Sequence, residues 1–90
     1  LYGAEAKYLV ALQWYNAGNY ASAEKEILNF IDQSTPYAYW LARSFILLSD
    51  VYVAMDKKLD ARQYLLSLQQ NYQADDDIAS MINERLEKLK

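Results

Sequence analysis

The sequence predicts an all-α protein built from antiparallel helix pairs that stack side by side. Three observations support this fold class. The 90 residues include only two glycines and one proline, too few for the turns of an all-β fold, although 53% of them are hydrophobic. Apolar side chains recur at spacings of three and four along most of the chain. A helix–turn–helix pattern near the N-terminus also recurs once further along the chain, at a constant offset.

The first helix pair is centred on the turn at Gly18 and Asn19. The first helix is expected over 4–17 and is apolar nearly all round, so other helices should cover more than one of its sides. Gly18 favours the left-handed conformation that ends a helix, and Asn19 suits the cap of the next one. The second helix, expected over 20–33, carries one apolar stripe.

Three more helices follow. The third is expected over 37–55, after the helix-start signal Ser34-Thr35-Pro36. Its charges, Arg43 and Asp50, would each cost about 2.5–3.5 kcal/mol in a bilayer, so we expect a helix buried in protein. The fourth is expected over 59–71. The fifth, over 76–89, follows Asp75-Asp76-Asp77, whose carboxylates favour the positive end of the helix dipole rather than a calcium loop, which needs more oxygen ligands and a glycine.

The repeat becomes clear when the two turns are aligned. A constant 38-residue offset superimposes Trp14 on Tyr52, Gly18 on Asp56, Ala23 on Ala61, Ile27 on Leu65 and Phe30 on Leu68. This pattern resembles the tetratricopeptide repeat (TPR) family, whose two helices carry an aromatic, a turn glycine and an A-x3-F motif. The resemblance implies an α-α superhelix of two TPR-like helix pairs plus a C-terminal capping helix. It divides the single domain 1–90 into a first repeat over about 4–36, a second over about 37–73 and a cap over about 75–89.

The second unit departs from the family pattern at its turn. Asp56 replaces the turn glycine and Lys58 the turn tyrosine. The unit is also longer than the family's usual length of about 34 residues. A generic αα-hairpin repeat therefore remains an alternative. The long unit is similar to TPR lipoproteins and cell-envelope TPR proteins of Gram-negative bacteria, which favours the periplasm or cell envelope over the cytoplasm.

The composition argues against several classes of function. The chain has no Cys and no His, so it lacks a thiolate nucleophile, the commonest general base and the commonest transition-metal ligands. Its net charge of −3 is unfavourable for nucleic acid. No phosphate loop or nucleophile–base pair is recognisable. We therefore expect a non-catalytic protein with no cofactor, no metal, no nucleic-acid partner and no direct membrane insertion.

The TPR resemblance implies that the first helix of each pair lines a concave face that binds a protein or peptide partner. Carried onto this sequence, the candidates are Glu5, Tyr8, Leu12, Tyr15, Asn16, Arg43, Ile46, Asp50 and Val53. As the alternative, Tyr8, Leu12 and Ile46 pack against neighbouring helices, and Arg43 and Asp50 are merely solvated. The chaperone-binding TPR subgroup uses Lys and Asn on this face to hold a carboxylate. Because Tyr8 and Leu12 stand at those positions, that clamp is not expected.

A second functional hypothesis is a purely structural end of a longer helical solenoid. Tyr8, Leu9, Leu12 and Tyr15 spread over more surface than the second helix can cover, which predicts an interface on the first helix. The fifth helix instead directs Glu84, Glu87, Lys88 and Lys90 outward, as a cap does. This asymmetry predicts that the chain is the C-terminal part of a longer array and that it self-associates through its first helix. The two hypotheses differ in whether an apolar concave patch stays open.

Overall fold

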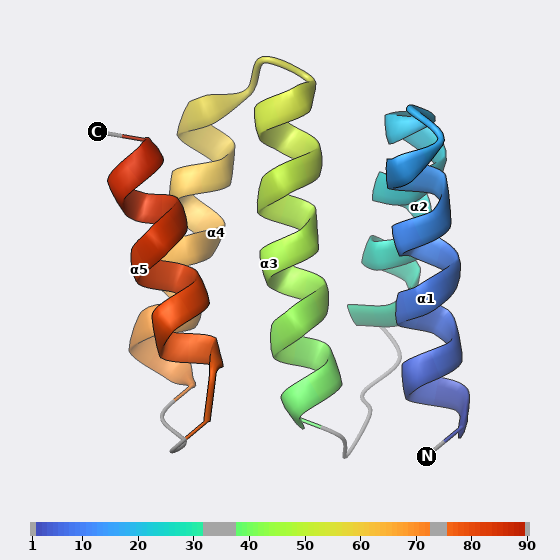
Figure 1. The fold of residues 1–90 in the computed structure, drawn as a ribbon, viewed down its shortest axis with the longest axis horizontal. Helices are drawn as coiled ribbons and strands as arrows, with labels where there is room; N and C mark the ends of the chain where they lie inside the picture. The colour runs from blue at the N-terminus through green and yellow to red at the C-terminus, as the bar shows by residue number, and fades with distance from the viewer. Residues whose placement is uncertain (1, 32–37, 73–75, 90) are drawn as a thin grey trace.

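The computed structural model describes residues 2–31, 38–72 and 76–89 and is all-helical over them, with no strand (Figure 1). The helices are α1 (Tyr2–Asn16), α2 (Tyr20–Ile31), α3 (Ala38–Ala54), α4 (Lys58–Asn71) and α5 (Ile78–Lys88). This confirms the predicted fold class, and the helix ends that are described lie close to their predicted positions. Ser34-Thr35-Pro36 and Asp75 lie outside the described residues. Among the helices described here, none has the length and hydropathy to cross a membrane.

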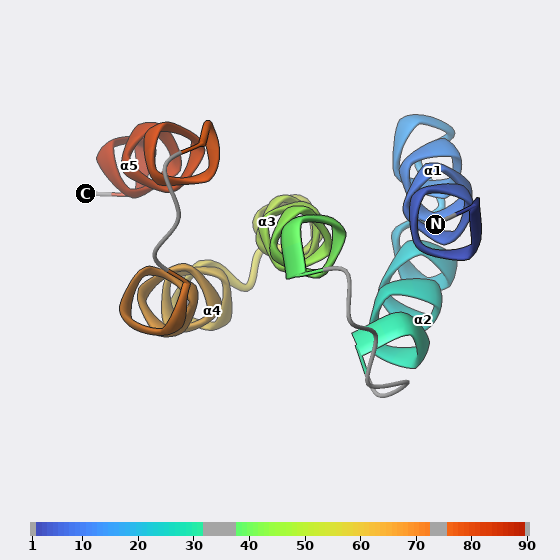
Figure 2. The ribbon, with the colours of Figure 1, turned by 90° about the horizontal axis from the view of Figure 1, so that it is seen from below.

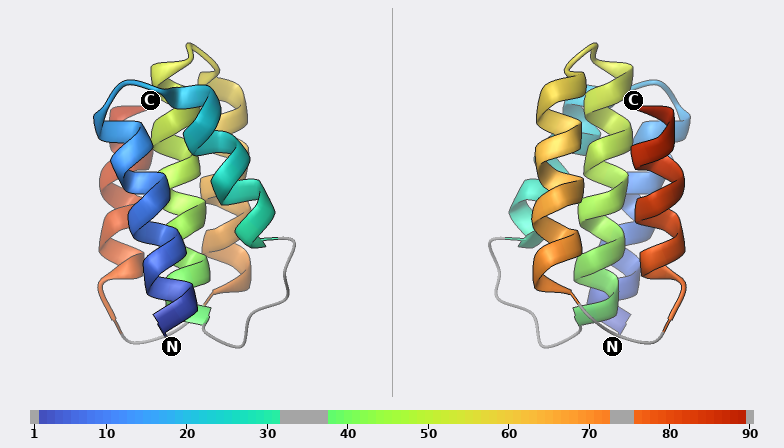
Figure 3. Two further views of the ribbon diagram at one scale, coloured as in Figure 1. Left: turned by 90° about the vertical axis from the view of Figure 1, so that its right-hand side faces the viewer. Right: turned by 90° about the vertical axis from the view of Figure 1, so that its left-hand side faces the viewer.

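The helices form two antiparallel pairs and a fifth helix. α1 packs against α2, α3 packs against α4, and α5 contacts both α3 and α4. Seen along the helices, α1, α3 and α5 follow one another on one side of the molecule, and α2 and α4 lie on the other (Figure 2). The body is flat, with extents of 35 × 31 × 18 Å. The α1–α2 pair forms one end of it, opposite α5 (Figure 3).

The two helix–helix turns have the same geometry. Gly18 and Asp56, which the repeat offset superimposes, have positive φ angles of 81° and 62°. The amide of Asn19 donates to the Trp14 carbonyl at 2.9 Å, and the equivalent amide of Lys57 donates to the Tyr52 carbonyl at 2.7 Å. Both are the long hydrogen bond that closes a helix with a left-handed residue. The turns are therefore equivalent in structure as well as in sequence.

Side-chain caps begin two of the helices. The Asn19 side chain accepts a hydrogen bond of 3.4 Å from the Ser22 amide at the start of α2. Before α5, the Asp76 carboxylate accepts one of 3.0 Å from the Ile78 amide. Asp77 makes no such bond, because its carboxylate accepts from the Tyr39 hydroxyl instead. Among the described members of the acidic run, Asp76 is therefore the one that caps α5.

The core consists of two clusters that meet along α3. One joins α3 to α1 and α2 around Ala23, Ile27 and Leu48, and the other joins α3 to α4 and α5 around Ile46, Leu65 and Ile82. Ala23 and Ala61 are both 0% exposed, as expected for residues at helix crossings. The hydroxyls of Ser44 and Ser49, also buried, donate to backbone carbonyls within α3, so they enter the core without losing a hydrogen bond.

The surface of α1 differs from the prediction in one respect. Tyr8 is covered within its own chain, and Leu12 and Tyr15 are half-buried against the first cluster. Of the four side chains predicted to be uncovered, only Leu9 is exposed. Val10 and Trp14 are exposed beside it, because α3 covers the Tyr8 side of α1 and leaves the opposite side open. The uncovered apolar surface is therefore on the side of α1 opposite Tyr8.

Because the two turns are equivalent, removing glycine at position 18 and introducing it at position 56 should have opposite effects on stability. Gly18→Ala should lower the free energy of unfolding by about 1 kcal/mol, because a Cβ disfavours the left-handed conformation. Added at Gly18, that Cβ meets no atom within 4 Å, so the cost is conformational rather than steric. Asp56→Gly should raise the free energy of unfolding by about 0.5 kcal/mol, because glycine adopts the left-handed conformation without the penalty of a Cβ. Urea denaturation measures both, and equal changes at the two positions would contradict the equivalence.

The helix crossings give a second prediction. Ala23→Leu and Ala61→Leu should each lower the free energy of unfolding by about 1–3 kcal/mol, because both sites are fully packed. Thermal denaturation provides the measurement. Ala79→Leu, on an exposed position of α5, is the control and should change stability by less than about 0.5 kcal/mol. Unchanged melting of both core variants would show that the crossings lie elsewhere.

Candidate functional site

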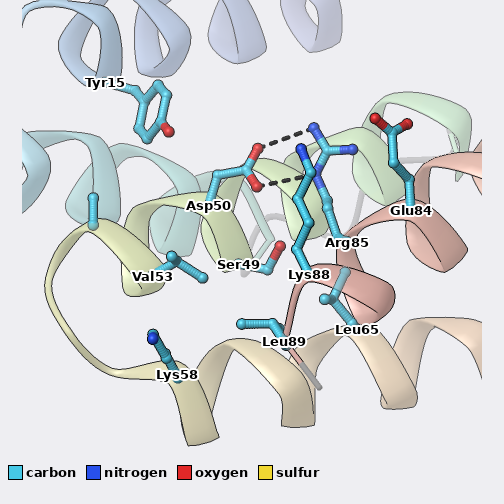
Figure 4. A pocket seen from close by; sticks show the side chains of 11 residues that line it. Tyr15, Ser49, Asp50, Val53, Lys58, Leu65, Glu84, Arg85, Lys88 and Leu89 are labelled. Carbon is cyan, nitrogen blue, oxygen red and sulfur yellow. Dashed lines mark hydrogen bonds and ion pairs between the residues drawn. The ribbon is translucent and has the colours of Figure 1, made fainter.

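Three parallel helices bring one side chain each into a row. Contacts between successive members of the α1, α3 and α5 series join residues 35 positions apart, as in Tyr8 with Arg43 and Asp50 with Arg85. The same spacing relates Tyr15 to Asp50. Tyr15, Asp50 and Arg85 therefore lie in sequence across the side of the molecule that α1, α3 and α5 share (Figure 4).

The Asp50–Arg85 ion pair forms the centre of this row. Arg85 Nε donates to one Asp50 carboxylate oxygen at 2.9 Å, and Nη2 donates to the other at 3.1 Å. A third donor, Nη1, contacts the Met81 carbonyl at 3.3 Å. The two side chains are only about a quarter exposed, at 26% and 25%. Such a two-pronged, charge-assisted contact fixes the relative position of α3 and α5.

A pocket of about 460 Å³ surrounds the ion pair (Figure 4). This size is within the range of ligand-binding clefts. Its apolar lining comes from α3, α4 and the C-terminal end of α5, and its polar groups come from all four contributing helices. The lining residues are Tyr15, Ser49, Asp50, Val53, Ala54, Lys58, Leu65, Glu84, Arg85, Lys88 and Leu89.

The pocket is more cationic than the chain as a whole. Lys58, Arg85 and Lys88 face two carboxylates, those of Asp50 and Glu84, whereas the chain carries a net charge of −3. Arg85 neutralises Asp50, and within the described part of the chain neither lysine has an ion-pair partner. Burial, followed by the negative charge of Asp50, raises the pKa of the Tyr15 phenol. Tyr15 therefore stays protonated at neutral pH, as a neutral donor at the pocket wall.

A second cluster ties the same three helices together nearer their N-terminal ends. The Arg43 guanidinium lies 5.3 Å from the centre of the Tyr8 ring and donates to the Tyr39 hydroxyl at 3.1 Å. That hydroxyl donates in turn to Asp77 at 3.0 Å. Burial lowers the pKa of Arg43, but its contacts with Tyr39 and Tyr8 outweigh this effect and raise it overall. The cluster thus holds a charged arginine between the Tyr8 and Tyr39 rings and joins α1 and α3 to Asp77, just before α5.

The nine predicted site residues fall into three groups. Tyr15, Asp50 and Val53 line the pocket. Tyr8, Leu12 and Ile46 pack against neighbouring side chains, and Ile46 is only 1% exposed; Arg43, for which the alternative was solvation, lies against the Tyr8 and Tyr39 rings. Glu5 and Asn16 are exposed on α1 away from the pocket. Asp50 is not a freely solvated residue, because Arg85 binds it.

Sequence reasoning missed the contribution of α5. Glu84, Arg85, Lys88 and Leu89 all line the pocket, although the fifth helix was expected only to cap the array. A signal for this role is present, because the 38-residue offset can be applied a second time. It carries Trp40, Ser44, Leu48 and Val51 of α3 onto Ile78, Ile82, Leu86 and Leu89 of α5. α5 therefore takes the place of the first helix of a third unit.

Comparison with protein families, curated proteins and solved structures found no match to this chain. Within the described residues there is no group of His, Cys, Asp or Glu side chains that would hold a metal ion. The site is therefore interpreted from its own geometry: a half-open pocket with an apolar wall, a fixed ion pair and two lysines without ion-pair partners among the described residues.

The ion pair gives a prediction that a double-mutant cycle can measure. Asp50→Asn and Arg85→Met should show a coupling energy of about 1 kcal/mol, because the contact is two-pronged but still partly in solvent. The control cycle uses Asp60→Asn and Arg62→Met on α4, whose exposed side chains lie two positions apart and do not face each other. Urea denaturation of the original chain, the single variants and the two double variants supplies both energies. Equal coupling in the two cycles would show that the Asp50–Arg85 contact contributes nothing specific.

Proposed function

We propose that the chain is a non-catalytic, TPR-like interaction domain that binds a segment of a partner protein in the pocket between α1, α3 and α5. The observation that carries this proposal is the 460 Å³ pocket itself, lined by residues of four helices. Rigid helices hold its walls, and the Asp50–Arg85 pair fixes its centre. A pocket held in this way is largely pre-formed, which lowers the entropic cost of binding.

The lining indicates the chemistry of the bound segment. Val53, Ala54 and Leu89 offer apolar surface for one aliphatic or aromatic side chain. Lys58 and Lys88 offer positive charge to an Asp or Glu, or to the terminal carboxylate of a peptide. The segment we expect is therefore a short peptide with an apolar residue close to an acidic group. Charge attraction of this kind weakens as ionic strength rises.

Catalysis is not part of the proposal. Tyr15 has a raised pKa and keeps its proton, and Asp50 is held by Arg85. Binding without chemistry is what the remaining lysines and apolar side chains support.

The test begins with a displayed library of random peptides selected on the 90-residue chain. We expect enriched peptides to combine an acidic and an apolar residue, and calorimetry should show that Val53→Glu weakens their binding by about tenfold or more through lost apolar contact and charge repulsion. Lys88→Glu should have a similar effect that diminishes at high salt.

The matched control is Leu28→Glu, which places the same charge on an exposed apolar residue of α2 outside the pocket. It should leave peptide affinity within about twofold of the original value. Peptides that bind the Val53 and Lys88 variants as tightly as the original chain would overturn the proposal. So would a selection that enriches no peptide.

A further inference from the structure

The outer face of α1, defined here as Ala6, Leu9, Val10, Gln13 and Trp14, is an apolar surface outside the pocket. These residues recur at i, i+3, i+4, i+7 and i+8, so they share one side of the helix. Leu9, Val10 and Trp14 are 46%, 42% and 38% exposed. Adjacent large apolar side chains at the surface of a small domain usually mark an interface.

α3 has a surface equivalent to the outer face of α1, and this surface is covered within the molecule. The 38-residue offset carries the outer face of α1 onto Ser44, Leu47, Leu48, Val51 and Tyr52 of α3. Each of these side chains is 7% exposed or less. Leu47, Leu48, Val51 and Tyr52 belong to the first core cluster, to which the α1–α2 pair contributes Tyr8, Ala11, Ala23 and Ile27 and α4 contributes Ala61. Within this fold, the face in question is therefore one that helices pack against.

We infer that a second copy of this chain covers the outer face of α1, by packing the same face against it across a two-fold axis. Charge is the reason for this choice of occupant. None of the five outer-face residues is charged and the exposed Lys7 lies at their border, so two copies that meet along Leu9, Val10 and Trp14 place uncharged side chains in contact. At the opposite end of the molecule, Glu87 is exposed on α5 outside the pocket, whereas Glu84 and Lys88 line the pocket. Head-to-tail stacking would bring the charged α5 end against Leu9, Val10 and Trp14.

A two-fold arrangement also closes on itself. In such an interface the same surface of each copy is used, so a dimer leaves no outer face of α1 uncovered. The pocket between α1, α3 and α5 involves Tyr15 but none of the five outer-face residues. Both copies would therefore keep their pockets open, and this inference does not depend on peptide binding.

The experiment is sedimentation of the 90-residue chain over a range of concentrations, with paired charge variants. The original chain should pass from monomer to dimer, and no larger species should form. Val10→Glu and Val10→Lys should each weaken dimerisation by about a hundredfold or more, because each buries like or unpaired charges in the interface. A mixture of the two variants should restore a dimer that contains one copy of each, because the faces then carry opposite charges.

Leu59→Glu and Leu59→Lys are the matched controls. Leu59 is an exposed apolar residue of α4, 81% exposed, and charges there should leave dimerisation unchanged. Circular dichroism of each variant checks that helix content is retained. A chain that stays monomeric at millimolar concentration overturns the inference. It is also overturned if the Val10 variants dimerise normally, or if their mixture gives no mixed dimer.

Discussion

The fold depends on α3, which must pack against every other helix. It contacts α1, α2, α4 and α5, and both core clusters include its side chains. A helix in that position has to be apolar on nearly all sides, and α3 has only two charged residues, Arg43 and Asp50. Both charges face the side that α1 and α5 share, where each reaches a residue of a neighbouring helix 35 positions away. The few polar groups of the central helix thus set the positions of its neighbours.

The helices and turns were predictable because their signals are local. A glycine at position 18 and an aspartate at position 56 both end a helix in the left-handed conformation, and the alignment placed them together. The stripe of α2 likewise identified Ala23, Ile27 and Phe30 as core residues. Local periodicity identifies one face when a helix buries a single stripe of residues. α2 and α5 each contact two helices but bury one such stripe, with Ala23, Ile27 and Phe30 on α2 and Ile78 and Ile82 on α5.

The candidate site was only partly predictable, because it is made by contacts between units. α1 and α3 are apolar nearly all round, so periodicity could not tell which apolar residues meet another helix and which line the pocket. Ile46 was for this reason placed on the concave face, although α4 and α5 bury it. Arg85 lay on a helix with a charged face, and only its 35-residue separation from Asp50, on equivalent helices, relates the two. A pairwise alignment of the first two units does not contain that information.

The two ends of the molecule differ in a way that limits how it can assemble. Each helix pair buries one side of the next, so a stack of such pairs always has an uncovered side at one end and a terminal helix at the other. Here the exposed side of α5 carries Glu84, Glu87 and Lys88, and burying it would leave charges without water. The charges of α1 are Glu5 and Lys7, near its N-terminus, and the sequence from Tyr8 to Ala23 is uncharged. An association that uses the same face of both copies, as inferred above for the outer face of α1, forms closed pairs rather than filaments.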